Sequence, residues 1–270
     1  MDGAKTRASL VVLLAATTLA ACNAGQHAPA PERARVAPLR VAVPYDSPPY
    51  GFRRDGKLVG LEIEFATELA ASLGRPLDLL PVSWTDVIPT LLAGQTDLAM
   101  AGLTITPARE VRIAFSDPYL RSGLLALMRR DDAARYPTPQ SVLNSGDAIG
   151  VVSGTTGERF VREHTRIASP LVYPSAAGAI TELGQRRVAL VVHDAPVVIW
   201  FVSGDEANLA ALLKPLDEEQ YGWGIRRGDD DLRTAVNATL ARWRTDGTRE
   251  HILDHWVPYW RRLESAEGRR

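Results

Sequence analysis

Short runs of apolar residues alternate with amphipathic segments along most of the chain. The run LRVAV at 39–43 has the length and composition of a buried strand. The following segment, LEIEFATELAASLG at 61–74, repeats an apolar residue every four positions and ends on glycine, which is typical of an amphipathic helix. This alternation of strands and helices predicts an α/β fold.

The rest of the chain continues the pattern in two series. We expect further strands at 77–82, 97–102, 147–152, 170–174, 188–192 and 218–227. We expect further helices at 84–94, from Thr155, at 175–185, from about Asp194 to Val202, and in two closing segments, DLRTAVNATLARWRTDG and REHILDHW. The extended run SGLLALMRR separates the two series, so the sequence predicts two lobes with a cleft between them.

The first residues have the pattern of a secretory leader. Lys5 and Arg7 precede an apolar run, Ser9 to Ala21, that is too short to span a membrane. The run ends in LAAC, which resembles a bacterial lipoprotein processing box, so we expect Cys22 to be lipidated and to become the N-terminus. A plain signal peptide or a buried free thiol is the alternative.

The predicted organisation follows from these segments. The stretch after Cys22 is rich in alanine and proline and predicts a tether that holds the folded body near a membrane without crossing it. The expected parts are a signal peptide (1–21), the lipidated cysteine and tether (22–38), lobe 1 (39–120 and 222–260), lobe 2 (121–221) and a charged tail (261–270).

Composition narrows the function classes. The 270 residues are 46% hydrophobic and 23% charged with a net charge of −1, which is ordinary for a globular protein and gives no electrostatic case for nucleic acid. The single cysteine excludes a disulfide within the chain. The sequence HILDH at 251–255 lacks the glutamate of a zinc-protease helix, and we expect neither a metal nor a cofactor.

The segment TITPAR, Thr104 to Arg109, is the first candidate site. Thr106 followed by Pro107 is a typical helix start, whose free N–H groups suit a carboxylate. Arg109 adds a guanidinium that can bind that carboxylate through two hydrogen bonds, although a helix dipole disfavours a cation there. The alternative is an ordinary cap and an exposed helical arginine.

Two segments of the second series complete the candidate site. In VVHDAP, Asp194 is either the cap of the next helix or a carboxylate that takes an ammonium group, and His193 is either a polar contact or a satisfied, partly buried side chain. In SGTTGE, Thr155 and Thr156 can offer hydroxyl and N–H groups to a carboxylate, and the lysine of a phosphate loop is absent. Together these groups match an α-amino acid zwitterion.

Aromatic residues lie near both segments. Trp84 heads a short helix after a strand and is expected either to cap the core or to form a flat wall beside a ligand. The loop PYDSPPYGF at 44–52 places Asp46 near the end of the first strand, and Tyr50 in this loop is expected to belong to the core.

These segments together resemble the family 3 extracytoplasmic solute-binding proteins, which serve polar amino acid ABC importers. The resemblance rests on GKLVGLEIEFATELAASLG, FSDPYLRSG, VVSGTTGE, LVVHDAP and the TITPARE region, and it covers 39–257. It implies the type II periplasmic-binding-protein fold, in which two lobes close on one ligand around hinges that would lie near 119–123 and 218–222.

The resemblance also implies roles for single residues. Arg109 would bind the α-carboxylate with Thr104 and Thr156, while the Gly102 carbonyl and Asp194 would bind the α-amine. Trp84 would be a wall beside the ligand and His193 a polar contact, as in the glutamine-binding branch. Three positions depart from the family pattern, because Pro44, Ser47 and Val152 stand where an acid, an aromatic and a lysine read the ligand side chain in other members.

The resemblance implies a lipid-anchored, monomeric, extracytoplasmic protein that delivers an amino acid to an inner-membrane permease. A sensory protein with the same cleft is one alternative. The other is a periplasmic dehydratase of arogenate or prephenate, which needs an acid catalyst. APVV after Asp194 supplies no such acid, so the sequence predicts a protein that is not an enzyme.

Overall fold

The computed structural model describes residues 36–165 and 170–265, and the part of the chain from Val36 onward forms one compact unit. The predicted leader, Cys22 and most of the tether lie outside the described residues. No helix within the described ranges has both the length and the apolar character that crossing a membrane requires.

The first sheet is a mixed, five-stranded sheet. Its strand order is β5 (Leu77–Val82), β1 (Leu39–Pro44), β6 (Leu98–Ala99), β13 (Gly224–Ile225) and β7 (Ala114–Phe115), with β1 parallel to its neighbours and β13 antiparallel to both of its own. The helices that accompany it are α1 (Leu61–Ser72), α2 (Val87–Leu92), α8 (Asp230–Asp246) and α9 (Thr248–Trp256).

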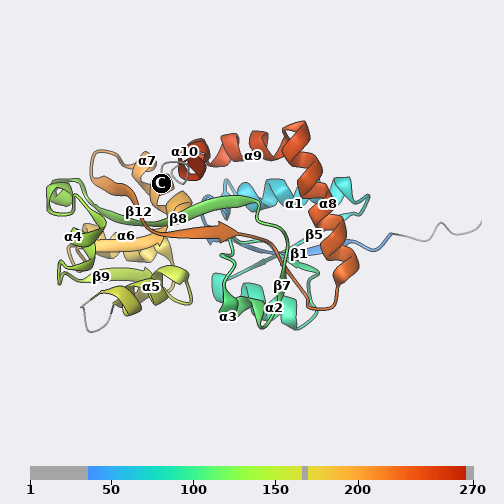
Figure 1. The fold of residues 1–270 in the computed structure, drawn as a ribbon, viewed down its shortest axis with the longest axis horizontal. Coiled ribbons are helices and arrows are strands. Elements are labelled where there is room, and N and C mark those ends of the chain that lie inside the picture. The colour runs from blue at the N-terminus through green and yellow to red at the C-terminus, as the bar shows by residue number, and fades with distance from the viewer. Residues whose placement is uncertain (1–35, 166–169, 266–270) are drawn as a thin grey trace, which may run out of the picture. The chain divides into compact units, whose positions relative to one another are not determined.

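The second sheet is also mixed and five-stranded. Its order is β10 (Leu171–Tyr173), β9 (Ile149–Val152), β11 (Leu190–Asp194), β8 (Leu120–Arg129) and β12 (Leu209–Tyr221). The helices α5 (Thr156–His164), α6 (Ala176–Gly184) and α7 (Ala195–Gly204) pack against it. Figure 1 shows the long strands β8 and β12 side by side, in the antiparallel pairing that runs from Leu209 to Tyr221.

Buried strands supply both faces of the sheets. In β1, Val41 and Val43 join one apolar cluster, while Ala42, between them, joins another. In β11, Leu190 and Val191 divide in the same way between the two faces of the second sheet. Successive side chains of a strand point to opposite faces, so helices on both sides of each sheet bury them.

The structure differs from the predicted elements in several places. The expected strand at 97–102 is only the two-residue β6, because Gly102 has a φ of +65°, which is not a strand conformation. The expected strand at 218–227 is divided between the end of β12, which stops at Tyr221, and the separate strand β13. The longer β12 also contains a register shift between Leu212 and Asp217. A helix, α10 (Trp260–Ser265), forms within the predicted tail.

Smaller elements were not predicted. They are the three-stranded sheet of β2 (Asp46–Ser47), β3 (Gly51–Arg54) and β4 (Lys57–Val59), the short helix α4 (Pro139–Leu143) and the 3-10 turn Arg130–Arg135. The helix start predicted at Thr106 is the short α3 (Pro107–Glu110), and the helix predicted at 84–94 begins as the 3-10 turn Trp84–Asp86 before α2. The chain crosses between the sheets beside these elements, where Tyr119 N–H donates to Tyr221 O at 2.9 Å and Gly222 N–H donates to Leu103 O at 3.0 Å.

Candidate functional site

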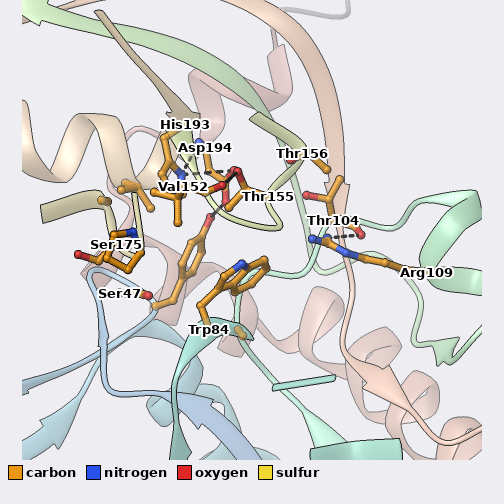
Figure 2. A pocket seen from close by; sticks show the side chains of 15 residues that line it. Ser47, Trp84, Thr104, Arg109, Val152, Thr155, Thr156, Ser175, His193 and Asp194 are labelled. Atoms are coloured by element: carbon orange, nitrogen blue, oxygen red, sulfur yellow. Dashed lines mark hydrogen bonds and ion pairs between the residues drawn. The ribbon is translucent and has the colours of Figure 1, made fainter. Parts of the chain in front are cut away.

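A pocket lies where segments of the first sheet face the carboxyl ends of β9 and β11 in the second (Figure 2). It encloses a cavity of about 30 Å³. The structure brings most of the predicted site residues together here, namely Trp84, Thr104, Arg109, Thr155, Thr156, His193 and Asp194. Gly102 and Asp46 do not line this pocket.

Arg109 is held at one end of the pocket by its own segment. The Thr106 side chain caps α3 by accepting from Arg109 N–H at 3.3 Å, which fixes the start of the helix as the sequence predicted. The guanidinium donates through Nη1 to Thr104 O at 2.9 Å and lies 5.4 Å from the centre of the Trp84 ring.

The structure changes the explanation for this arginine. Because α3 has only four residues, its dipole is small, and Arg109 lies in its last turn as well as its first. The positive charge at this end of the pocket is therefore that of the guanidinium and not of the helix dipole. Burial lowers the pKa of Arg109. Its Nη2 donates across the pocket to Gly154 O at 3.4 Å, which joins the two sheets.

The threonines of the pocket have different partners. Thr155 caps α5, because its Oγ1 accepts from Glu158 N–H at 3.2 Å and donates to Val152 O at 2.7 Å. The hydroxyl of Thr156 is hydrogen-bonded to Glu219. Thr104 is buried beside Arg109. Thr155 is thus largely engaged in its cap, and Thr104 and Thr156 line the pocket together with Arg109.

Asp194 is a buried carboxylate on the wall that belongs to the second sheet. It occupies the cap position of α7 but makes no side-chain capping hydrogen bond. Instead, Tyr50 Oη donates to its Oδ2 at 3.3 Å, and this contact joins the two sheets. The structure therefore favours the alternative in which Asp194 faces the pocket over the one in which it caps the helix.

His193 is buried next to this carboxylate. Its Nδ1 accepts a hydrogen bond from the Asp194 N–H at 2.7 Å, so this nitrogen carries no proton. The same Nδ1 lies 3.5 Å from the Asp194 Oδ1. His193 thus has an internal partner and also lines the pocket, so both readings of the sequence apply to it.

Gly102 lies just behind the pocket. Its N–H donates to Glu62 Oε1 at 2.6 Å, and its φ of +65° is one that residues with a side chain rarely adopt. A Cβ atom here would lie 2.4 Å from Cζ of Tyr50, so the tyrosine ring packs directly on the glycine. Tyr50 is 2% exposed, as expected of a core residue, and it also lines the pocket.

Sequence reasoning missed two buried acids. Glu62, in the first turn of α1, is fully buried and accepts from Tyr119 Oη at 2.6 Å and Trp223 Nε1 at 3.0 Å. Burial raises its pKa to about 7. Glu219, in β12, is buried near Arg109, and its pKa is raised by burial and then by Asp194. The segment EEQY is polar, and the one signal in it that could have identified Glu219 is that Tyr221, two residues on, shares its face of the strand.

The pocket therefore has a half-buried cation, Arg109, on one wall and a buried carboxylate, Asp194, on the other. A cavity of about 30 Å³ holds roughly one or two water molecules, so a larger ligand enters only when the walls move apart. Within the described ranges, no cluster of three or more His, Cys, Asp or Glu residues is arranged to hold a metal ion. His255 of the HILDH segment contacts Glu64 instead, at 2.9 Å.

Comparison with known proteins identifies similar chains. The model of the bacterial extracellular solute-binding proteins, family 3, matches residues 39–259. An L-cystine-binding protein of Escherichia coli is 29% identical over 210 residues, which are 77% of this chain and 78% of that protein. A cyclohexadienyl dehydratase of Pseudomonas aeruginosa is 28% identical over 234 residues, or 86% of each chain.

Solved structures have the same fold. The structure of an ancestral arginine-binding protein bound to arginine matches with a TM-score of 0.75 and 30% identity, over 83% of this chain and 99% of that one. The predicted two-lobe α/β fold is thereby confirmed. Binding proteins predominate among the relatives, but the dehydratase shows that an enzyme also occurs among them.

Proposed function

Because this chain belongs to the bacterial extracellular solute-binding proteins of family 3, we propose that it captures one L-amino acid between its two sheets and delivers it to an ABC importer. The observation that carries the proposal is the pairing of the half-buried Arg109 and the buried Asp194, two oppositely charged side chains on facing walls of one pocket. Relatives that bind cystine and arginine support the same class of ligand.

The charges assign the two ends of the ligand. The guanidinium of Arg109 binds the α-carboxylate, and the hydroxyls of Thr104 and Thr156 add hydrogen bonds to it. Asp194 takes the α-ammonium group through Oδ1, because Tyr50 already occupies Oδ2. Each charge of the zwitterion then has an oppositely charged partner, so neither charge leaves water without compensation.

Capture is reversible and requires no chemistry. The chain crosses between the sheets at β8 and β12, near the expected hinges at 119–123 and 218–222. The ligand contacts both walls, so it favours the closed arrangement over the open one by the difference in its affinity for the two. The closed form is then recognised by a permease in the inner membrane.

The remaining parts of the proposal concern location. The leader pattern and Cys22 support an extracytoplasmic, lipid-anchored protein, with the tether to residue 38 joining the anchor to the folded part. We propose that it acts as a monomer. Detection of a diacylglyceryl group on Cys22 by mass spectrometry of the membrane fraction is the expected result, and an unmodified thiol there contradicts the anchor.

Calorimetric titration tests the function directly. A chain starting at residue 24 is titrated with the twenty L-amino acids. We expect one or a few to bind, and we expect Arg109→Ala and Asp194→Ala each to weaken binding about a hundredfold, because each leaves one charge of the ligand unpaired.

Matched controls separate the site from general effects of charge. Arg242→Ala and Asp131→Ala remove exposed residues of the same types and should leave the affinity unchanged. The proposal fails when no amino acid binds, or when the controls weaken binding as much as the site variants do.

A second candidate function is a dehydratase reaction on arogenate or prephenate. Glu219 favours it, because a buried carboxyl with a raised pKa can act as a general acid, and a dehydratase is among the relatives. Two observations weigh against it. Glu219 does not line the pocket, and Val197 lines it just beyond Asp194.

Turnover distinguishes the two candidates. The binding function predicts no decarboxylation of prephenate or arogenate, whereas turnover that is lost in Glu219→Gln would establish the enzyme. A sensory role would use the same pocket, and it predicts a receptor gene rather than permease and ATPase genes beside this one.

A further inference from the structure

The end of the pocket that remains for the ligand's side chain is the feature that leads beyond the proposed function. Figure 2 shows Arg109 and Thr104 at one end of the pocket and Ser47 and Ser175 at the other. If the carboxylate binds Arg109 and the ammonium binds Asp194, the side chain of the ligand extends toward the two serines. This step rests on the proposed function.

The charges around the pocket are few and already assigned. Among the residues that line it, the ionisable groups other than Tyr50 are Arg109, Asp194 and His193. The first two bind the zwitterion, and His193 is engaged with the backbone of Asp194. Glu219 is another buried acid near the pocket. It is hydrogen-bonded to Thr156, which lies toward the Arg109 end of the pocket.

The end of the pocket lined by Ser47 and Ser175, called the serine end below, therefore has no acid on its wall. Its lining residues include Ser47, Ser175, Pro174 and Ala176. Asp46 is the acid closest to them in sequence, but it is exposed and does not line the pocket. A lysine or arginine side chain reaching this end would thus leave water without gaining a charged partner.

Helix α6 also disfavours a cationic ligand side chain at the serine end. Ser175 is its cap, because its Oγ accepts from Gly178 N–H at 3.2 Å. The helix has nine residues, and the partial positive charge at its N-terminus disfavours a cation. Ser175 retains a hydroxyl hydrogen that it can donate to a polar ligand atom, since its acceptor role is the one used by the cap.

The size of the pocket limits the side chain as well. Trp84 and Tyr50 line the pocket with aromatic rings, and Val152 and Val197 line it with apolar side chains. The cavity among them is about 30 Å³. A short side chain needs less displacement of these walls than a long one, and close packing makes such displacement costly.

From this lining we infer that the ligand is an amino acid with a short, uncharged side chain, of the size of alanine, serine, threonine or valine. Cationic amino acids are excluded by the absence of a carboxylate at the serine end rather than by the site for the α-carboxylate and α-amine. The ligand class of this chain then differs from that of the arginine-bound ancestral protein, although the fold is shared.

The first test compares amino acids on the unchanged protein. Alanine, serine, threonine, valine, arginine, lysine and glutamate are titrated in turn by calorimetry. We expect the best short, uncharged amino acid to bind at least about tenfold more tightly than arginine or lysine. Arginine, lysine or glutamate binding as tightly as that amino acid overturns the inference but leaves the proposed function intact, whereas silence from every amino acid overturns both.

The second test supplies the missing acid. Ser47→Asp places a carboxylate at the serine end, and it should raise the affinity for arginine at least about tenfold while lowering that for the short amino acids. Ser47→Asn is the matched control, because it has the same size without the charge, and it should not admit arginine. Equal arginine affinity in the two variants, with both folded by circular dichroism, overturns the inference.

Discussion

Tyr50, Gly102 and Asp194 determine one corner of the pocket at the scale of single residues. The ring of Tyr50 lies on Gly102, and its hydroxyl donates to Asp194 at 3.3 Å. The glycine thus serves two needs, a left-handed backbone and close approach of the ring. The left-handed backbone and the close approach of the Tyr50 ring both apply at this one position.

Replacement of this glycine tests the two needs separately. We expect Gly102→Ala to lower the free energy of unfolding by about 3 kcal/mol, from the left-handed φ and from the Cβ that would lie 2.4 Å from Tyr50. Gly74→Ala is the control, because Gly74 has a φ of +63° and nothing within 4 Å of an added Cβ. It should cost only about 1 kcal/mol. Equal losses for both in urea unfolding would contradict the packing argument.

Helix α1 connects three parts of the first lobe through one side chain at the scale of elements. Glu62 in its first turn accepts hydrogen bonds from Gly102, Tyr119 and Trp223, which belong to the candidate site and to the two crossing segments. Burial raises the pKa of Glu62 to about 7, although these three donors oppose the rise. The carboxyl therefore changes its charge near neutral pH while holding the Gly102 loop.

Stability should depend on pH through this carboxyl. Its pKa is about 7 in the folded protein and 4.5 as the ordinary value, so its contribution to stability is complete below pH 4.5 and is lost as the pH rises through 7. At about 1.4 kcal/mol for each pH unit, the loss is at most about 3 kcal/mol. Urea unfolding from pH 4.5 to 8 measures it.

Glu62→Gln is the comparison that isolates this group. The amide keeps the shape but cannot titrate, so its unfolding free energy should fall less steeply with pH than that of the unchanged protein. In both proteins Glu219 also makes the unfolding free energy fall as the pH rises, because burial raises its pKa too. Parallel pH profiles would show that Glu62 remains ionised in the fold.

Three contacts join the two sheets across the pocket at the scale of the whole molecule. Trp84 Nε1 donates to Ser153 O at 3.1 Å, Arg109 donates to Gly154 O at 3.4 Å, and Tyr50 donates to Asp194. Each of them breaks when the walls of the pocket separate. They therefore stabilise the closed arrangement together with the ligand.

Trp84→Phe removes one of these contacts and keeps an aromatic ring beside Arg109. Loss of a hydrogen bond worth about 1 kcal/mol should weaken ligand binding about fivefold and lower the closed fraction of the free protein. Calorimetry measures the first effect and small-angle X-ray scattering the second. An unchanged affinity together with unchanged scattering would contradict a role of this contact in closure.

The candidate site was predictable where the chemistry is local to a short segment. Thr106, Pro107 and Arg109 form a cap and a helix start that their own order specifies, and the structure has both. Thr155 and Asp194 follow strands that the apolar pattern identified, so their place at the carboxyl ends was expected. The roles of these residues in binding stay predictions.

Other features depend on contacts between distant segments. Glu62 and Glu219 belong to segments whose local pattern suits a surface, and only the packing of α1 and β12 makes them buried. Asp46 was placed at the site from its loop, yet the loop turns Ser47 toward the pocket instead. Gly102 shortened a predicted strand, because its conformation is set by Tyr50 and Glu62, 52 and 40 residues away in sequence.

The sequence by itself determined the α/β class, most of the strands and helices, and the two segments that bear Arg109 and Asp194, because periodic burial and helix caps act over a few residues. The tertiary structure alone decided which groups face one another across the pocket, which acids are buried, and that the serine end has no acid. These depend on the packing of segments as far apart as Glu62 and Trp223, which are 161 residues apart in the sequence. The energy of a charged side chain depends on its burial and its neighbours in space, which a short stretch of sequence does not specify.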